Sequence, residues 1–339
     1  MSVLTEIQGL FTPAAVALAM EKLPVLATSV IDTLYSEAKE HPFTAIGLQD
    51  LEVVTGTLPV VRRDSAAIPH RGQRDEVNLF APRPLKPSVT ITASELGDLK
   101  LIWGQRQSRE AFVSRKVDQL RQLIRNSTEG MASVTATTGR LTWPSRLEGG
   151  ALETYELDFG QPNRLDLDPA TAWDAAEPPS LADVYNHLTK LDLEVTENGG
   201  GGNLAFLAGR DAFSALIRLA EKWQSTAGGG PISLKLENGA VNIGGHEIKR
   251  LVERYLSPLD DTWVEKIPPK ILLGYSRDQK GAIFYLAVDS LSGLDQARPF
   301  HVFAKEVDDM AIHLIAQAKP VPVRAPRGMI ISQVTNLHR

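Results

Sequence analysis

Residues 105–137 read QRQSREAFVSRKVDQLRQLIRNSTEGMASVTAT and contain no proline. Apolar side chains recur along this stretch at steps of three and four, with one turn skipped, which is the spacing of one helix face. These positions are Val113, Val117, Leu120, Ile124, Met131 and Val134. Gly139 and Pro144 follow as stop signals. The pattern predicts a single helix of about 45–50 Å, which is long enough to cross a whole domain.

The opposite face of this predicted helix is basic. Its arginines are Arg106, Arg109, Arg115, Arg121 and Arg125. An ordinary amphipathic core helix explains the pattern, with the arginines in solvent or facing another subunit. A coiled coil fits less well, because only about three heptads are available and Gly130 interrupts the run.

The totals indicate a folded protein of one elaborate domain or two modest ones. The chain has 339 residues, of which 43% are apolar and 23% charged, and its formal net charge is -5. A dedicated nucleic-acid binder would carry a basic surplus. The absence of cysteine excludes disulfides, thiolate catalysis and cysteine-based zinc sites. No stretch approaches 18 uninterrupted apolar residues, so we expect no membrane partner.

Before the long helix, the sequence predicts two elements of different character. Residues 13–40 read as two short helices separated by Pro24. Residues 43–100 are rich in β-forming residues, but the middle of this segment is basic and contains several prolines. Two explanations stay open, a flexible surface loop or an arm that contacts another subunit. The arm explains the apolar residues Ile68, Val77, Leu79 and Phe80, which a free loop would expose.

After the long helix, the chain predicts a hairpin and then a mixed unit. Residues 140–160 read as two strands with Gly149-Gly150 at the turn. A polar, proline-rich connector follows, and we place a domain boundary there. Ser180 is predicted to cap the next helix with Asp183 at the capping-box position. Helices and strands then alternate, and the β-rich tail is expected to return to the first domain's sheet.

No constellation for catalysis, cofactor binding or metal binding is found in the sequence. The glycine run 199–202 precedes a predicted strand, which is the wrong order for a phosphate-binding loop. The seven histidines form no metal-ligand motif. The adjacent pairs Asp260-Asp261 and Asp308-Asp309 are interpreted as solvated turns. We therefore expect a protein that is not an enzyme.

The order of these parts resembles the major capsid proteins of tailed bacteriophages of the lambda type. This is the major capsid protein E family, which has the Hong Kong 97-type fold. The resemblance is carried by FTAIGLQDLEVVTGTLPVVRRDSAAIPH (43–70), by the segment 91–141 that leads into and through the long helix, by YELDFG (155–160) and by ATAWDAAEPP (170–179). These motifs are loose, so the resemblance depends on their order and spacing over nearly the whole chain.

The resemblance implies an α+β fold with five parts. These are N-terminal helices or arm in 1–45, β-strands and an extended loop (the E-loop) in 46–100, a peripheral domain in 101–180, an axial domain in 181–299, and return strands to the peripheral domain in 300–339. The long helix 105–137 would be the spine helix of the peripheral domain. The extended loop would have its tip at about 62–87.

The resemblance also implies a structural function. Copies of the chain would form pentamers and hexamers that close into an icosahedral shell around a phage genome, as part of the virion, after assembly in the host cytoplasm. The residues expected to contact a neighbouring subunit are Arg62, Arg63, Ile68, His70, Arg74, Val77, Leu79, Phe80, Arg83 and Lys86. The implied partners are the chain itself, a portal protein, a separate scaffolding protein, a decoration protein and double-stranded DNA contacted non-specifically. An encapsulin-type compartment is the alternative, and an oligomeric enzyme is a weaker one.

Overall fold

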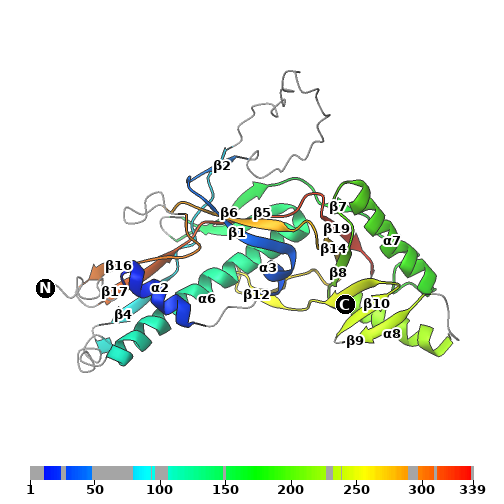
Figure 1. Cartoon of the computed structure of the whole chain (residues 1–339), viewed down its shortest axis with the longest axis horizontal. Helices are drawn as coiled ribbons and strands as arrows, with labels where there is room; N and C mark the ends of the chain where they lie inside the picture. The colour runs from blue at the N-terminus through cyan, green and yellow to red at the C-terminus, as the bar shows by residue number, and fades with distance from the viewer. Residues whose placement is uncertain are drawn as a thin grey trace, which may run out of the picture.

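The computed structural model describes residues 11–23, 28–47, 79–92, 94–95, 106–147, 150–226, 232–237, 239–288, 297–308 and 311–336. Its longest element is the helix α6 (Arg106–Thr138), which runs for 33 residues along the elongated half of the molecule (Figure 1). At 1.5 Å per residue this helix is about 50 Å long. The predicted spine helix is therefore confirmed.

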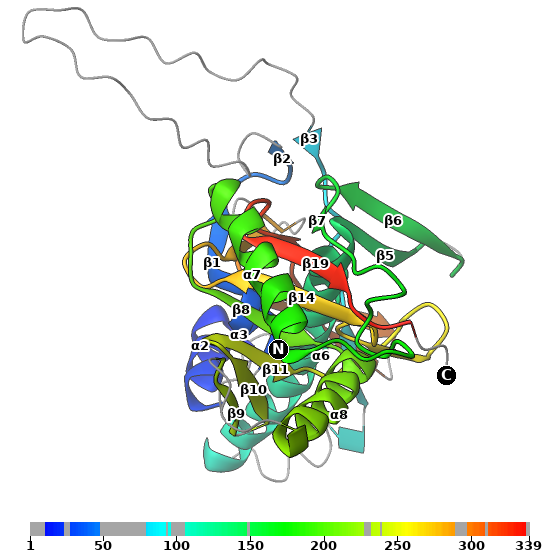
Figure 2. The ribbon, with the colours of Figure 1, turned by 90° about the vertical axis from the view of Figure 1, so that its right-hand side faces the viewer.

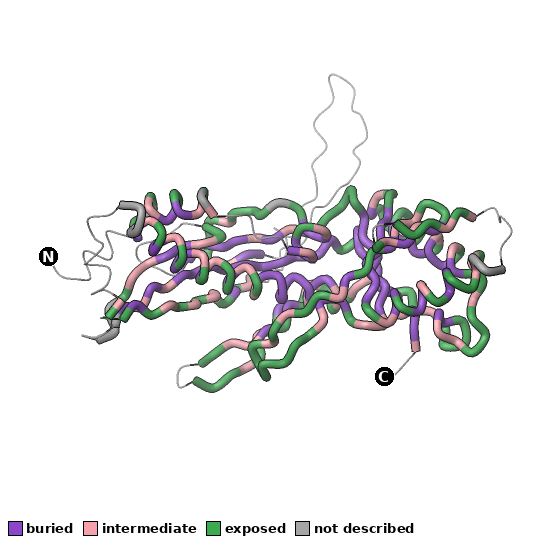
Figure 3. Tube along the Cα trace, turned by 90° about the horizontal axis from the view of Figure 1, so that it is seen from below, coloured by how far each residue is buried: buried purple, intermediate pink, exposed green. Residues whose placement is uncertain are grey.

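Buried residues run through the interior of the molecule (Figure 3), and the predicted apolar face of α6 belongs to them. Five of its six positions are buried and Val134 is half-buried. The first half of this face packs on α2 (Pro13–Lys22) and on a three-stranded antiparallel sheet. The strands of that sheet, in spatial order, are β16 (His301–Asp308), β17 (Ala311–Gln317) and β4 (Ser88–Thr92). Strands from near both ends of the chain thus cover the spine helix.

The second predicted N-terminal helix is shorter than the sequence suggested. Helix α3 (Ser29–Leu34) ends where the strand β1 (Tyr35–His41) begins. This part of the prediction was wrong because β1 pairs in parallel with β15 (Gly281–Leu286), a partner far along the chain that no local pattern reveals. β15 also pairs with β18 (Pro320–Val323), which completes a second three-stranded sheet.

The opposite end of the molecule is built on a seven-stranded mixed sheet (Figure 1). Its strands, in spatial order, are β7 (Asn163–Arg164), β19 (Met329–Gln333), β14 (Ile271–Ser276), β8 (Leu204–Ala208), β11 (His246–Arg250), β10 (Ala240–Ile243) and β9 (Leu234–Glu237). The final strand β19 therefore lies here, whereas β16 and β17 lie beside β4. The tail is divided between two sheets.

Both faces of the seven-stranded sheet are covered. Alternate residues of a strand point to opposite faces. On one face, Leu204 and Phe206 pack with α7 (Leu181–Glu197) and α8 (Arg210–Thr226). On the other face, Ala205 and Leu207 belong to a cluster that includes residues of α3, α6 and β1. The Ser180–Asp183 capping box of α7 is present as predicted.

A buried ion pair joins three elements near the middle of the spine helix. Glu129 of α6 accepts hydrogen bonds from the backbone N–H groups of Val30 (2.8 Å) and Ile31 (3.0 Å) at the start of α3. Its carboxylate also lies 2.9 Å from Nζ of Lys266, whose second partner is Glu253. Burial works to lower the pKa of Lys266, but the two carboxylates outweigh it and the pKa is raised. Lys266 is thus held charged.

Three two-stranded hairpins complete the described structure. They are β5 (Arg140–Arg146) with β6 (Leu152–Asp158), β12 (Arg254–Leu256) with β13 (Trp263–Glu265), and β2 (Ile46–Gly47) with β3 (Leu79–Phe80). The first confirms the hairpin predicted at 140–160, although Gly149 of its turn lies outside the described residues. No helix in the described ranges is long and apolar enough to cross a membrane.

Candidate subunit interface

The extended loop has its base at a short antiparallel pair. Ile46 of β2 lies opposite Phe80 of β3, and Gly47 lies opposite Leu79. Residues 48–78 connect these two strands and lie outside the described residues. Figure 2 shows β2 and β3 together at the upper edge of the body. The described residues on either side of this segment are therefore neighbours.

Four of the ten predicted contact residues fall in the described structure. Arg62, Arg63, Ile68, His70, Arg74 and Val77 lie outside it. Leu79 and Phe80 form β3, and Arg83 and Lys86 follow it with exposed side chains. The structure therefore brings together the base of the predicted interface. The contact role of all ten residues stays a prediction.

Phe80 and Arg83 hold the loop base to the hairpin β5–β6. The ring of Phe80 lies 6.3 Å from the ring of Phe159, measured between centroids. The guanidinium of Arg83 donates to Ser145 Oγ at 2.7 Å, pairs with Glu153 and lies over the Tyr155 ring. Since the Arg83–Glu153 pair is solvent-exposed, it contributes at most about 1 kcal/mol. Its role is to orient the loop base against the hairpin.

The burial of Tyr155 shows that the loop base packs closely against the hairpin β5–β6. Burial raises the pKa of its phenol to about 12, against a smaller opposing effect of Arg83. The ring packs with the cluster around Trp143, Leu157 and Leu286. The hairpin β5–β6 is therefore an integral support for the loop base and not a free flap.

The hairpin β12–β13 was not recognised in the sequence. Three of its large apolar residues are exposed, namely Leu256, Leu259 and Trp263. The sequence predicted only a solvated turn at Asp260-Asp261, and both residues are exposed in the structure. An available signal was the spacing of the apolar residues around this acidic turn, since a turn flanked by strand-forming residues predicts a hairpin.

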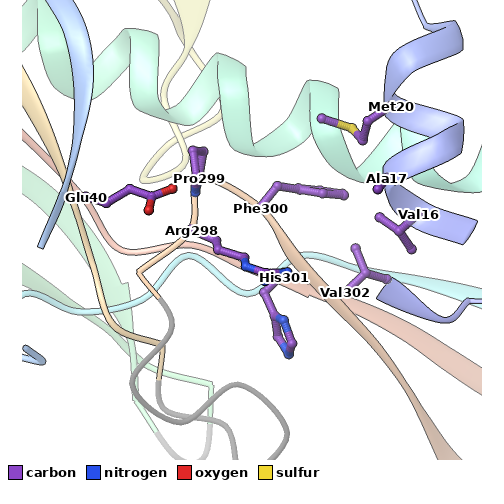
Figure 4. Close-up of a pocket in the computed structure, with 9 residues that line it drawn as sticks. All are labelled: Val16, Ala17, Met20, Glu40, Arg298, Pro299, Phe300, His301 and Val302. Carbon is purple, nitrogen blue, oxygen red and sulfur yellow. The ribbon is translucent and has the colours of Figure 1, made fainter. Parts of the chain in front are cut away.

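A small cavity lies between α2 and the start of β16 (Figure 4). Its volume is about 280 Å³. Phe300 points toward Val16 and Met20 of α2, whereas the imidazole of His301 points away from them (Figure 4). Burial lowers the pKa of His301, and Arg298 adds to this effect. The lining combines apolar side chains of α2 with the polar groups of Glu40, Arg298 and His301.

The described residues contain no group of three or more histidine or acidic side chains arranged to hold a metal ion. What the structure does provide is an elongated α+β body, a spine helix and a paired base for an extended loop. The spine helix and the extended loop are features that the resemblance to a capsid protein implied.

Two solved structures share this fold over almost their whole length. One is the protein assigned as the capsid protein of a prophage in E. coli CFT073, with 17% sequence identity, a TM-score of 0.60, and coverage of 95% of this chain and 97% of that chain. The other is a phage-related protein from Bordetella bronchiseptica RB50, with 10% identity, a TM-score of 0.53, and coverage of 97% and 98%. At these identities the likeness establishes the fold.

The family is established by sequence. The family model of phage major capsid protein E matches residues 12–334, so the chain belongs to this family. It is a phage major capsid protein and a component of the virion, as the resemblance implied. No curated protein matches the chain. The holo-encapsulin complex from Synechococcus elongatus PCC 7942 shows 12% identity and a TM-score of 0.43, covering 96% of this chain and 98% of that chain. The family match supports a phage capsid protein over the encapsulin alternative.

Proposed function

We propose that copies of this chain form pentamers and hexamers, and that the extended loop of each copy, with its expected tip at about 62–87, contacts a neighbouring copy. Membership of the phage major capsid protein E family supports assembly from identical subunits. The observation that carries the proposal is the pairing of β2 with β3, which closes the loop 48–78 at its base. In a closed ring each subunit makes this contact twice. Its own loop lies on one neighbour, and the loop of the other neighbour lies on it.

The proposed contact residues combine two kinds of chemistry. Ile68, Val77 and the other apolar side chains would be covered by the neighbouring copy, which removes apolar surface from water. The basic side chains at Arg62, Arg63 and Arg74 would pair with acidic groups on that copy. Within one subunit, Arg83 at the loop base already forms an ion pair with Glu153. This is an example of the arginine–carboxylate pairing proposed between copies.

The domain roles belong to the same proposal. The region around α6, from residue 101 to 180, is the proposed peripheral domain, and the seven-stranded sheet lies mainly in the proposed axial domain, 181–299. The segments 1–45 and 46–100 are the proposed N-terminal part and loop arm. The distribution of 300–339 over two sheets supports a role for this tail in joining the two domains.

The proposed partners follow from the shell. The genome inside it is double-stranded DNA, contacted without sequence specificity, and assembly in the host cytoplasm involves a portal protein, a separate scaffolding protein and a decoration protein. We also propose that the chain is not catalytic. Membership of a family of structural capsid proteins supports this.

The loop proposal is tested by replacing residues 48–78 with a short Gly-Ser turn. Because β2 and β3 are already neighbours, this replacement preserves the base contacts of Phe80 and Arg83. We expect a folded subunit that forms no particles in negative-stain electron micrographs, while the wild-type chain, expressed with its scaffolding protein, does. A second variant replaces 48–78 with a Gly-Ser segment of the same length, which keeps the chain length but removes the side chains of the loop. It is also expected to form no particles. Closed shells from either variant would contradict the proposed role of the loop.

A further inference from the structure

Two hairpins project from the same side of the body, the green β5–β6 and the yellow β12–β13 (Figure 2). Their contact is made by Trp143 of β5 and Tyr255 of β12, whose ring centroids lie 5.8 Å apart. Gly130 of the spine helix makes room for both rings, since a Cβ there would lie 2.6 Å from Trp143 Cη2 and 3.1 Å from Tyr255 Cδ2. The two hairpins, here called the paired hairpins, are thus fixed to each other and to α6.

The outer face of β12–β13 carries one apolar cross-strand pair next to a charged one. The register places Leu256 opposite Trp263 and Tyr255 opposite Val264, and residues opposite each other share a face. Since Tyr255 faces Trp143, Leu256 and Trp263 point away from the body. The residue Trp263 is 65% exposed, which is unusual for a tryptophan.

Exposed apolar residues concentrate on the paired hairpins. Twelve large hydrophobic residues are exposed in the part of the chain that the structure describes. Six of them lie on these hairpins: Leu147, Leu152, Leu256, Leu259, Trp263 and Val264. Single exposed apolar residues are normal on a protein surface, whereas a concentration of them marks an interaction site. A two-stranded hairpin is also marginally stable by itself, so a partner that covers this face would stabilise it.

We propose that the paired hairpins bind a second copy of this chain. This inference rests on the proposed function, because a shell subunit must cover several of its own edges. It adds a contact that is separate from residues 62–87. Arg83 links the loop base to β5–β6, so the two contact regions adjoin on the molecule.

The charges on the paired hairpins favour another copy of the chain over DNA. Arg140 and Arg146 lie on β5, Glu153 lies on β6, and Asp260 and Asp261 occupy the tip of β12–β13. This mixture suits the polar rim of a protein–protein interface. DNA would require a basic surplus, and the acidic tip opposes it.

The test compares two double variants with the wild-type chain. Trp263→Ser with Leu259→Ser removes the apolar contact, whereas Trp263→Phe with Leu259→Met keeps it. A tenfold change in affinity corresponds to about 1.4 kcal/mol, which is less than the burial of one large apolar side chain provides. We expect the serine variant to need at least about a tenfold higher concentration to form particles, and the conservative variant to assemble as the wild type does. Equal assembly of the serine variant and the wild type would overturn the proposal.

A second measurement does not depend on whether the serine variant folds. Acrylamide quenches the fluorescence of exposed tryptophans. The part of this quenching that comes from Trp263 is the difference between the wild type and the Trp263→Phe variant. It is expected to fall when subunits assemble, and no change in it would also overturn the proposal. Failure of the wild type itself to form particles would instead count against the proposed function, so the two outcomes are distinguishable.

Discussion

His187 is a buried histidine that the proposed function does not use. It lies on α7, and its Nε2 is 2.9 Å from Ser332 Oγ on β19. Burial lowers the pKa of this imidazole to about 4, with a further lowering by Lys190 and an opposing effect of Asp166. The side chain is therefore neutral in the folded protein at pH 7, and it serves as a neutral hydrogen-bonding link between α7 and the sheet.

The pKa of His187 predicts a loss of stability in acid. In the unfolded chain this group takes up a proton near pH 6.5, but in the folded protein only near pH 4. Its contribution is therefore fully present above about pH 6.5 and is lost as the pH falls toward 4. Between pH 7 and pH 5 we expect this group to lower the free energy of unfolding by about 2 kcal/mol.

Urea unfolding of the unassembled subunit at the two pH values measures this effect. The matched variant His187→Gln keeps a hydrogen-bonding side chain but does not titrate. Its loss of stability between pH 7 and pH 5 should be smaller than that of the wild type by about 2 kcal/mol. Identical losses in the two proteins would show that His187 does not cause the acid sensitivity.

At the scale of elements, Glu129 is the main link between the spine helix and its neighbours. Its side chain is only 3% exposed, and it satisfies two N–H groups at the start of α3 as well as the ammonium of Lys266. The N-cap residue Thr28 makes no side-chain cap to α3. Glu129 thus performs the capping role from a distant part of the chain.

Removing this carboxylate is expected to be costly. Glu129→Ala should lower the free energy of unfolding by about 3–5 kcal/mol, because it leaves a buried cation with one partly exposed partner. Glu129→Gln should cost less, about 1–3 kcal/mol, since the amide oxygen still accepts one backbone hydrogen bond. Both values follow from urea unfolding of unassembled subunits. A change of less than about 0.5 kcal/mol in the alanine variant, the size of an ordinary surface substitution, would contradict the linking role.

The glycine run 199–202 also acts at the scale of elements. It connects α7 to β8, and a Cβ at Gly200 would lie 2.0 Å from the carbonyl oxygen of Arg327. Gln279 Nε2 donates to the Gly199 carbonyl at 2.8 Å. The run therefore permits a close approach between two backbone segments within the subunit. A substitution at Gly200 is therefore expected to disturb the folding of the subunit itself, so it is a poor test of shell closure.

At the scale of the whole molecule, the periodic and capped elements were predictable. The apolar spacing along 105–137 identified α6, and Ser180 with Asp183 identified the start of α7. These features depend on residues that are close in the sequence. The helix and strand order then pointed to the family that the match over residues 12–334 establishes.

What the sequence did not predict depends on pairing between distant segments. β1 was interpreted as the end of a helix because its parallel partner β15 lies beyond residue 280. The contact between the paired hairpins was not predicted because Trp143 and Tyr255 are also remote in the sequence. Of the candidate interface, the base at Phe80 and Arg83 is described, and the contacts between copies remain predictions.

The most direct measurement of the central claim is electron cryomicroscopy of particles assembled from the wild-type chain, at a resolution that traces residues 48–78. We predict a closed shell in which this segment of each copy lies on the adjacent copy. Single subunits that never assemble, or a segment 48–78 folded against its own body within the particle, would contradict the account.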